Sequence, residues 1–541
     1  MVKEVVRFSR VLRSETGPLD GLLAVCGAMG LAFVWWWRWA HVPVWPRSWD
    51  AVDFALALDR FDMLAMQPHF PGYPYFIAAG MLVHRWVENP VVALSRLNAL
   101  TTMAAAVPMY LLARTWCGPG ASLFVVLLVQ SAPYLWGTAG EPMSEGMAAA
   151  VFWWYAWAVK RAWVSRRFSD EAVASFAFSV LTGVRLSWWP FGLMLAALWW
   201  RRIAAVQGDV RRLVRVAALA CGGMALAAAF QGVWIAALAA AEGGWRELWL
   251  LARSFTAGHF TEWGQTAVGS DVPAVERIVR VAAYGVGWTA LGAQSPALAS
   301  LLSVWFAFAA AIGILARRAM RAESPGMSGN RSADRAAGRF AAIAAAAVAC
   351  YAVWVVIGQN VDKPRHVIPV ALAMLFACAC VALGHVRRLR RADLRTAAAV
   401  LALAVAGVQL VVGAQAVRRQ AEEMPAVVQM AEAVARLPGP VKLYTWEETR
   451  VLEFLQVPFF HERVYTYRPA LLREEAKTRR VLLTDHVLEG WTRQDPDAAE
   501  HVRELFRFRS SGLWDPVYGS VVVYEWVERA ALHETGRAGA N

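Results

Sequence analysis

The chain of 541 residues is 58% hydrophobic and only 18% charged, and it contains 28 tryptophans. This balance excludes an ordinary soluble enzyme and indicates a polytopic α-helical membrane protein with some material outside the bilayer. The net charge of +13 does not indicate a nucleic-acid partner, because the arginines and lysines lie in short clusters at the ends of apolar runs, as in the cytoplasmic loops of membrane proteins.

Apolar runs of about 20 residues recur along the chain and predict transmembrane helices. They follow a mixed N-terminal segment, residues 1–18, which we expect to be cytoplasmic. Clear spans are expected at residues 19–39, 98–115, 121–136, 143–162, 214–239, 297–316, 341–357, 367–382 and 397–415. Three further apolar runs are ambiguous, at residues 73–86, 175–200 and 275–290.

The basic residues decide how these three runs are placed. If residues 73–86 crossed the membrane, the arginine-rich turn at 160–167 would lie outside, against the positive-inside rule. We therefore place residues 73–86 and 275–290 in the outer interface. Residues 175–200 carry arginines at both ends and are expected to form a hairpin of two short half-helices, which Pro190 breaks.

The resulting topology has about 11 to 13 transmembrane helices between residues 19 and 416. The N-terminus is expected inside, and a long first external loop covers residues 40–97. Five polar features then lie on the same outer face: residues 50–69, Glu141, Arg185, residues 255–265 and residues 359–366. We expect the functional site on that face.

Asp50 and Asp53 lie in the helical stretch WDAVDFALAL of the first external loop. Acids in a first helical turn stabilise the positive end of the helix dipole, so capping alone explains both. A carboxylate at the membrane boundary can also act as a general base on a hydroxyl or amine, or bind a metal ion. His69 follows in the rigid turn QPHFPGYP, where a structural role and a catalytic one are both open.

Glu141 and Arg185 are the next candidates. Glu141 precedes a proline at the start of a span, where both residues are ordinary helix-start chemistry, but it could also pair with the acids of the first loop. Asp50 and Glu141 are the candidate ligands if a metal ion is bound. Arg185 lies at the apex of the predicted hairpin and needs an anionic partner, either an acid of the protein or the phosphate of a lipid carrier.

Lys363, Arg365 and His366 open a late span in the sequence DKPRH. Snorkelling to lipid headgroups explains the two cations, and a clamp on a phosphate is the alternative, for which the arginine fork is well suited. His259 and Trp263 lie in RSFTAGHFTEWGQT and are candidate residues of a substrate loop, although an interfacial tryptophan belt also explains Trp263.

Residues 417–541 have mixed charge and predict a small extracytoplasmic α/β domain. Strand patterns occur at residues 441–444, 480–484 and 520–526, with helical patterns at 447–455 and 470–477. The six cysteines of the chain lie in or beside apolar runs without metal-ligand spacing, so we expect neither a disulfide framework nor a zinc site.

These motifs resemble those of the C-type (GT-C) integral-membrane glycosyltransferases. The likeness is to the bacterial relatives of protein O-mannosyltransferases and of the aminoarabinose transferase of lipid A. It rests on WDAVDFALAL, QPHFPGYP, the acid of the second external loop, the hairpin GVRLSWWP and the late KPRHVIP, within residues 20–415.

The resemblance implies a sugar donor on a polyprenyl phosphate and an inverting transfer, at the bacterial plasma membrane, to an extracytoplasmic protein, lipid or polysaccharide. It implies that the first-loop acid is the base, which corresponds to Asp50 with Asp53 as substitute. The second-loop acid corresponds to Glu141, and the contacts to the carrier phosphate correspond to Arg185 and Arg365. The family often has aspartate where this chain has Glu141, and this departure leaves the role of Glu141 and any dependence on a divalent metal open. No other cofactor is implied.

Two other classes of function remain open. A transporter or flippase of a lipid-linked saccharide predicts charges at mid-membrane and an internal repeat, whereas this sequence has one broken helix pair and no repeat. A non-catalytic membrane protein predicts that Asp50 and Asp53 are only capping residues.

Overall fold

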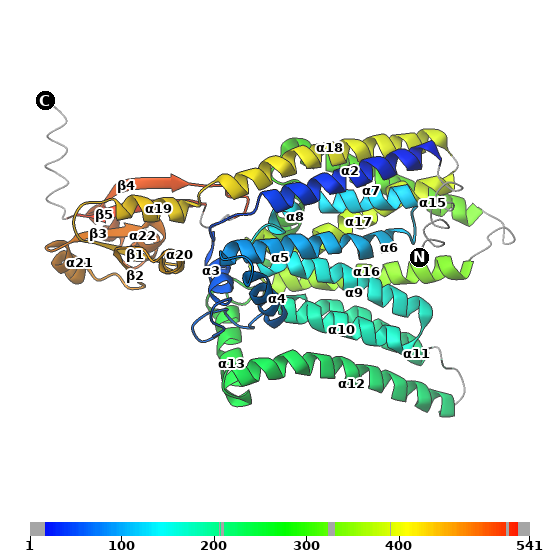
Figure 1. Cartoon of the computed structure of the whole chain (residues 1–541), viewed down its shortest axis with the longest axis horizontal. Helices are drawn as coiled ribbons and strands as arrows, with labels where there is room; N and C mark the ends of the chain where they lie inside the picture. The colour runs from blue at the N-terminus through cyan, green and yellow to red at the C-terminus, as the bar shows by residue number, and fades with distance from the viewer. Residues whose placement is uncertain are drawn as a thin grey trace.

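The computed structural model describes residues 17–204, 206, 210–322, 331–389, 391–514 and 519–527. The predicted cytoplasmic segment 1–18 therefore lies almost wholly outside the described residues. Figure 1 shows a bundle of long helices that run side by side, with a small sheet domain beyond one end. The bundle is formed by α2 (Pro18–Ala40), α5 (Pro90–Ala104), α6 (Ala106–Ala113), α7 (Pro119–Gln130), α9 (Ser144–Ser165), α10 (Phe168–Val184), α11 (Leu193–Ala204), α12 (Val210–Ala241), α15 (Pro296–Ala322), α16 (Arg331–Gly358), α17 (Ile368–Gly384) and α18 (Ala392–Glu422).

The chain is a multi-pass membrane protein. Among the described residues, seven helical segments are long and apolar enough to cross a bilayer. They are Pro18–Ala40, Pro90–Ala113, Val214–Ala241, Pro296–Arg318, Arg335–Gly358, Pro364–Gly384 and Ala392–Ala435. The shorter α7 packs between α2 and α17, and α9 packs between α5 and α10. The predicted membrane fold is confirmed.

Close contact between α2 and α7 depends on two glycines. A side chain at Gly30 would bring its Cβ to 2.6 Å from Leu127 Cδ2, and one at Gly27 would lie 3.2 Å from the backbone of α7. Small residues at such positions allow two helix backbones to approach, which is a main source of helix association in lipid.

Short elements cover the end of the bundle that faces the sheet domain. They include α3 (Trp49–Leu56), α4 (Pro74–His84), α8 (Pro133–Thr138), α13 (Trp245–Thr261), α14 (Ala274–Val279) and the π-helix η2 (Arg280–Leu291). In Figure 1, α13 runs across this end of the bundle. The 11 residues of α4 are too few to span a hydrocarbon core of about 30 Å, as predicted for residues 73–86.

The predicted hairpin is present but is longer than the expected residues 175–200, because α10 begins at Phe168 and α11 ends at Ala204. Helices α10 and α11 are joined by the 3₁₀ turn η1 (Leu186–Gly192), which contains Pro190, and Arg185 is the residue between α10 and η1. Arg185 at the apex pairs with Glu145 in the first turn of α9, and α11 ends at the end of the bundle away from the sheet domain (Figure 1).

The C-terminal domain holds a five-stranded sheet of order β2-β1-β3-β5-β4. Strand β1 pairs in parallel with β2 and β3, and β5 pairs antiparallel with β3 and β4. Its elements are α19 (Ala426–Ala435), β1 (Val441–Thr445), α20 (Glu448–Leu455), β2 (Phe460–Arg463), α21 (Pro469–Ala476), β3 (Arg480–Thr484), α22 (Asp485–Thr492), η5 (Pro496–His501), β4 (Val502–Arg509) and β5 (Ser520–Trp526). The predicted strands β1, β3 and β5 and helices α20 and α21 are all present.

The sheet domain is attached to the bundle at several points. Helix α18 continues through residue 417 to Glu422 and leads into α19. Val52 of α3 is completely buried in the core of the C-terminal domain. Arg47 donates hydrogen bonds to the carbonyl oxygens of Gln420, at 2.6 Å, and Glu423, at 3.0 Å. These contacts fix the first external loop between the two parts of the molecule.

Candidate active site

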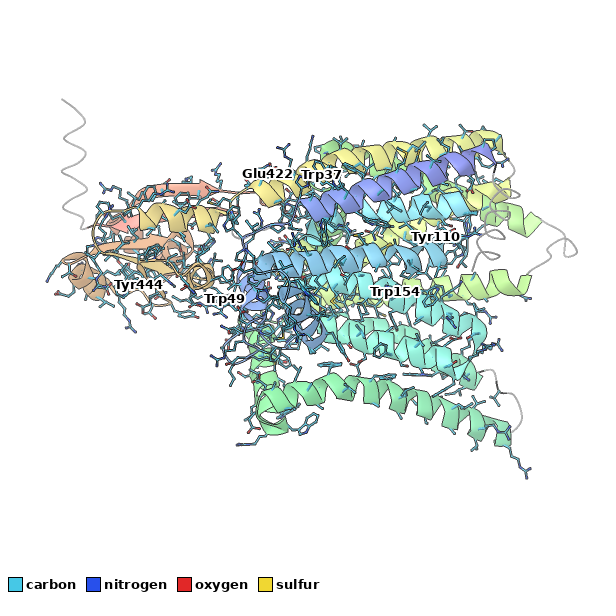
Figure 2. All side chains as sticks on the ribbon, in the orientation of Figure 1. Trp37, Trp49, Tyr110, Trp154, Glu422 and Tyr444 are labelled. Carbon is cyan, nitrogen blue, oxygen red and sulfur yellow. The ribbon has the colours of Figure 1, made fainter. Side chains whose placement is uncertain are left out.

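A pocket lies at the junction of the bundle, the first external loop and the C-terminal domain. We call it the junction pocket. Figure 2 shows Trp49, one of its lining residues, between the helix bundle and the sheet. The lining residues are Pro43, Trp45, Arg47, Ser48, Trp49, Asp50, Ala51, Tyr134, Glu141, Pro142, Met143, Lys363, Pro364, Arg365, Glu447 and Trp514.

Four of the residues predicted from the sequence line this pocket: Asp50, Glu141, Lys363 and Arg365. They come from three segments far apart in the chain. Asp50 stands in the first turn of α3, which Ser48 caps by accepting a hydrogen bond from the amide of Ala51. The expected helix start is therefore present, and its first-turn acid faces the pocket as well.

A chain of ion pairs runs from Asp50 into the bundle. Arg365 Nη2 lies 2.6 Å from Asp50 Oδ2, and Arg365 Nε lies 3.3 Å from Glu145 Oε1. Arg185 Nη2 lies 3.0 Å from the same Glu145 oxygen, and Arg185 Nη1 donates to Ser144 Oγ at 2.9 Å. We call Asp50, Arg365, Glu145 and Arg185 the charge chain. Two guanidinium groups thus converge on one buried carboxylate, which leaves N–H donors for a further anion.

The electrostatics of Asp50 follow from this arrangement. Partial burial would raise the pKa of its carboxyl group, but the positive charge of Arg365 outweighs burial, with smaller effects from His69, Lys363 and Arg185. The pKa of Asp50 is therefore held well below its ordinary value. Asp50 is ionised throughout the physiological pH range.

Asp53 has a different environment from Asp50. Its side chain is completely buried, and its two oxygens are bound by Arg450 Nε at 2.9 Å and His69 Nδ1 at 3.0 Å. His69 Nε2 in turn lies 2.8 Å from the hydroxyl of Tyr73. Burial raises the pKa of Asp53, and its hydrogen bonds to His69 and Arg450 oppose that rise. Neither Asp53 nor His69 lines the junction pocket.

Glu141 lies at the corner between α8 and α9. The side-chain amide of Asn98 donates to the carbonyl oxygens of Glu141, at 2.7 Å, and Met143, at 2.8 Å, which fixes the backbone of this corner. Gln420 Nε2 donates to Glu141 Oε1 at 3.2 Å. Asp50 and Glu141 both line the junction pocket, and a paired-carboxylate role for them stays a prediction.

The late basic segment is divided between the pocket and the core. Lys363 and Arg365 line the pocket, whereas His366 is buried below it, and its carbonyl oxygen accepts a hydrogen bond from Tyr351 at 2.9 Å. In the described part of the chain, the Lys363 ammonium group makes no ion pair within 4.0 Å. The structure does not bring His366 to the pocket.

His259 and Trp263 also lie outside the pocket lining. His259 Nε2 lies 2.9 Å from the carbonyl oxygen of Gly358 and its ring contacts Trp263, so the two residues connect α13 to the end of α16. Phe255, on the same helix, stacks on His69 with ring centroids 6.1 Å apart. The predicted substrate loop thus packs against the first-loop turn in this structure.

One group of ligand-type side chains lies elsewhere among the described residues. Ligand atoms of Glu448, Asp485 and His486 lie within 4.8 Å of one another, at the carboxyl ends of β1 and β3. Burial would lower the pKa of His486, but its hydrogen bond to Glu448 and the nearby acids raise it to about 9. In this structure His486 forms ion pairs with Glu448 and Asp485.

Comparison with known proteins identifies the fold of the chain. No protein-family model matches the chain, and no curated protein matches it. Among solved structures, ArnT from Cupriavidus metallidurans bound to undecaprenyl phosphate matches with a TM-score of 0.51 and 13% sequence identity, over 93% of this chain and 98% of that one. The chain has the GT-C fold.

Two other GT-C structures cover the chain with lower scores. The oligosaccharyltransferase AglB from Archaeoglobus fulgidus, in complex with an inhibitory peptide and a dolichol-phosphate, has a TM-score of 0.49 and 13% identity, over 92% of this chain and 75% of that one. The mycobacterial arabinofuranosyltransferase AftD has a TM-score of 0.42 and 15% identity, over 94% of this chain and 41% of that one.

Sequence reasoning missed two residues of this candidate site. Glu145 is 1% exposed and joins Arg185 to Arg365, although in the sequence it reads as an ordinary first-turn acid. Arg450 belongs to the C-terminal domain and binds Asp53 across 397 positions of sequence. For Glu145 the available signal was its spacing of one helical turn from Glu141. No local sequence feature marked Arg450.

Proposed function

We propose that this protein is an integral-membrane glycosyltransferase that moves a sugar from a polyprenyl-phosphate donor to an acceptor outside the cytoplasm, with inversion at the anomeric carbon. The observation that carries the proposal is the charge chain at the junction pocket. The GT-C fold supports a reaction of this class, and the undecaprenyl phosphate bound by ArnT supports a lipid-linked donor.

The donor phosphate binds to Lys363 and Arg365 in this proposal. Both side chains line the pocket, and Arg365 has a planar fork of N–H donors that suits two phosphate oxygens. Arg185 supports this interaction through Glu145, because each guanidinium group is held by the same carboxylate. The lipid tail extends into the bilayer beside the bundle.

Asp50 becomes the base when the phosphate arrives. While it is paired with Arg365, its carboxylate accepts a proton poorly, because a depressed pKa gives proton transfer little driving force. A phosphate on Arg365 competes with Asp50 for the guanidinium group. The displaced carboxylate then accepts a hydrogen bond from the acceptor hydroxyl. The positive charge of Arg365 is now shared between this carboxylate and the phosphate.

The reaction is a single displacement. The acceptor oxygen forms a bond to the anomeric carbon while the bond from that carbon to the phosphate oxygen breaks. The bonding pair leaves with the polyprenyl phosphate, and the acceptor proton passes to Asp50. Negative charge grows on the leaving phosphate, where Lys363 and Arg365 stabilise it.

Carrier binding tests the proposal at its first step. We expect wild-type protein in nanodiscs to bind undecaprenyl phosphate, and Arg365→Leu to weaken binding by about tenfold or more, since charge-assisted hydrogen bonds are lost. Arg436→Leu removes one exposed arginine just after α19 and is the matched control, expected to bind as wild type. Equal affinity of wild type and Arg365→Leu contradicts the proposed phosphate site.

A further inference from the structure

The junction pocket contains a carboxylate that the proposed donor chemistry does not use. Glu447 lines the pocket from the C-terminal domain, at the residue that precedes α20. Within the described part of the chain its side chain makes no hydrogen bond and no ion pair within 4.0 Å. The neighbouring Glu448 is fully engaged, because it accepts a hydrogen bond from the amide of Trp446 at 2.9 Å and pairs with His486.

The fold explains why Glu447 reaches the pocket. The residue follows β1, the strand that pairs in parallel with both β2 and β3. Residues at the carboxyl ends of parallel strands form the ligand sites of open α/β sheets. Glu448 anchors this turn to His486 of α22, the helix that follows β3. The position of Glu447 is therefore fixed by its neighbour, while its own carboxylate oxygens stay available to a ligand.

The charges around Glu447 come from both parts of the molecule. Lys363 and Asp50 face it from the bundle side, Arg463 faces it from β2, and Glu448 faces it from α20. Burial raises the pKa of Glu447, and Lys363 and Arg463 oppose that rise. A half-buried carboxylate without a hydrogen-bond partner in the protein can accept hydrogen bonds from hydroxyl groups of a ligand.

The other lining residues indicate what kind of ligand fits. Four aromatic side chains line the same pocket: Trp45, Trp49, Tyr134 and Trp514. Trp514 stacks on Tyr134 at 5.6 Å, so part of this wall is held in place. Aromatic faces pack against the apolar C–H faces of sugar rings, while carboxylates accept hydrogen bonds from adjacent ring hydroxyls, and the pocket combines both.

We propose that Glu447 is the acceptor-binding residue of the junction pocket and that the acceptor is a saccharide. This inference rests on the proposed transferase function and adds the acceptor side to it. Lys363 and Arg365 hold the donor phosphate, Asp50 takes the proton, and Glu447 holds ring hydroxyls of the acceptor. The C-terminal domain thereby selects the molecule that is glycosylated.

The first test measures binding without a donor. A panel of p-nitrophenyl glycosides is tested by saturation-transfer NMR against full-length protein in nanodiscs, with wild type, Glu447→Gln and Glu474→Gln. Glu474 is an exposed acid of α21 in the same domain and serves as the matched control. We expect at least one glycoside to bind wild type and Glu474→Gln equally and to bind Glu447→Gln about tenfold or more weakly. Equal binding by all three proteins overturns the role of Glu447.

The second test separates this inference from the proposed function. With a radiolabelled donor, wild type partitions the sugar between the glycoside and water, and we expect Glu447→Gln to lower the ratio of transfer to hydrolysis by about tenfold. An unchanged ratio contradicts the inference. Transfer to a Ser/Thr-rich peptide and to no glycoside overturns the saccharide acceptor, whereas glycoside binding without any donor turnover by wild type contradicts the transferase proposal alone.

Discussion

Asp50 has two roles in the structure, one in the start of a helix and one in an ion pair of the pocket. It stands in the first turn of α3, where an acid stabilises the helix start, and its carboxylate pairs with Arg365 at 2.6 Å. The same positive charge that keeps Asp50 ionised makes it a poor base in the free protein. In the proposed mechanism the donor phosphate activates Asp50, because an anion that binds Arg365 releases the carboxylate.

His486 gives a prediction for the pH dependence of stability. Its pKa is raised to about 9, so the folded protein holds this proton more tightly than the unfolded chain, whose histidine pKa is about 6.5. The resulting stabilisation, at most about 3 kcal/mol, is complete below pH 6.5 and is lost as the pH rises through about 9. We expect the unfolding temperature of the wild type to fall over this interval and that of His486→Gln to fall less. Identical pH profiles would show that the ion pair with Glu448 contributes nothing.

Some of the site residues could be predicted from local sequence, and the reasons are physical. Asp50, Glu141, Lys363 and Arg365 are charged residues at helix starts on the same expected face, and all four line the pocket. His366 lies one position beyond Arg365, yet it is buried in the core because the 3₁₀ turn there points successive side chains in different directions. The sequence pattern alone could not show that Arg365 lines the pocket while His366 lies in the core.

At the scale of elements, α3 and α20 are joined by a buried ion pair. Arg450 binds Asp53 and also donates to the carbonyl oxygens of Ala65 and Met66, each at 3.0 Å. The guanidinium group therefore holds both the helix and the turn of the first external loop against the C-terminal domain. Asp53 is better explained as part of this attachment than as a substitute for Asp50.

Removal of Arg450 tests this attachment. Arg450→Met leaves Asp53 as a buried charge with one partner fewer, and we expect a loss of about 3–5 kcal/mol of stability, read as a lower unfolding temperature. Arg436→Met, which breaks an exposed pair on α19, is the control and is expected to cost less than about 1 kcal/mol. The double variant Asp53→Asn with Arg450→Met should recover part of the loss. A loss of equal size in Arg436→Met and Arg450→Met would argue against the attachment.

The strands that sequence analysis missed share one property. β4 has the exposure of an edge strand with few buried residues, and β2 has only four residues, of alternating exposure. The strands β1, β3 and β5 are apolar and mostly buried, so their composition marks them. Edge strands acquire their structure from the neighbour they pair with, which a single local window does not contain.

At the scale of the whole molecule, composition and the placement of arginines predicted the membrane fold. The GT-C fold confirms that prediction, and the hairpin at Arg185 was predicted from the arginines at both ends of the run and from Pro190. The docking of the C-terminal domain could not be predicted in this way. It depends on contacts such as Val52 in the core of the C-terminal domain and Arg450 on Asp53, which connect segments hundreds of positions apart.

The orientation of the molecule is open to direct measurement. The positive-inside rule predicts that the basic turns face the cytoplasm and the C-terminal domain lies outside. In a cysteine-free background, a cysteine at Glu474 should react with a membrane-impermeant maleimide in intact cells, and one at Arg317 should react only after lysis. The reverse labelling pattern would invert the topology and place the junction pocket in the cytoplasm.

The most direct test of sugar transfer by the junction pocket is turnover of radiolabelled polyprenyl-phosphate sugars. A panel of these donors is given to liposomes that contain either wild type or Asp50→Asn. We expect wild type to transfer or hydrolyse at least one donor, and Asp50→Asn to lose turnover by about 100-fold or more while still binding the carrier. Turnover by Asp50→Asn at the wild-type rate would contradict Asp50 as the base. Carrier binding without turnover in either protein would contradict the transferase and favour transport of a lipid-linked saccharide.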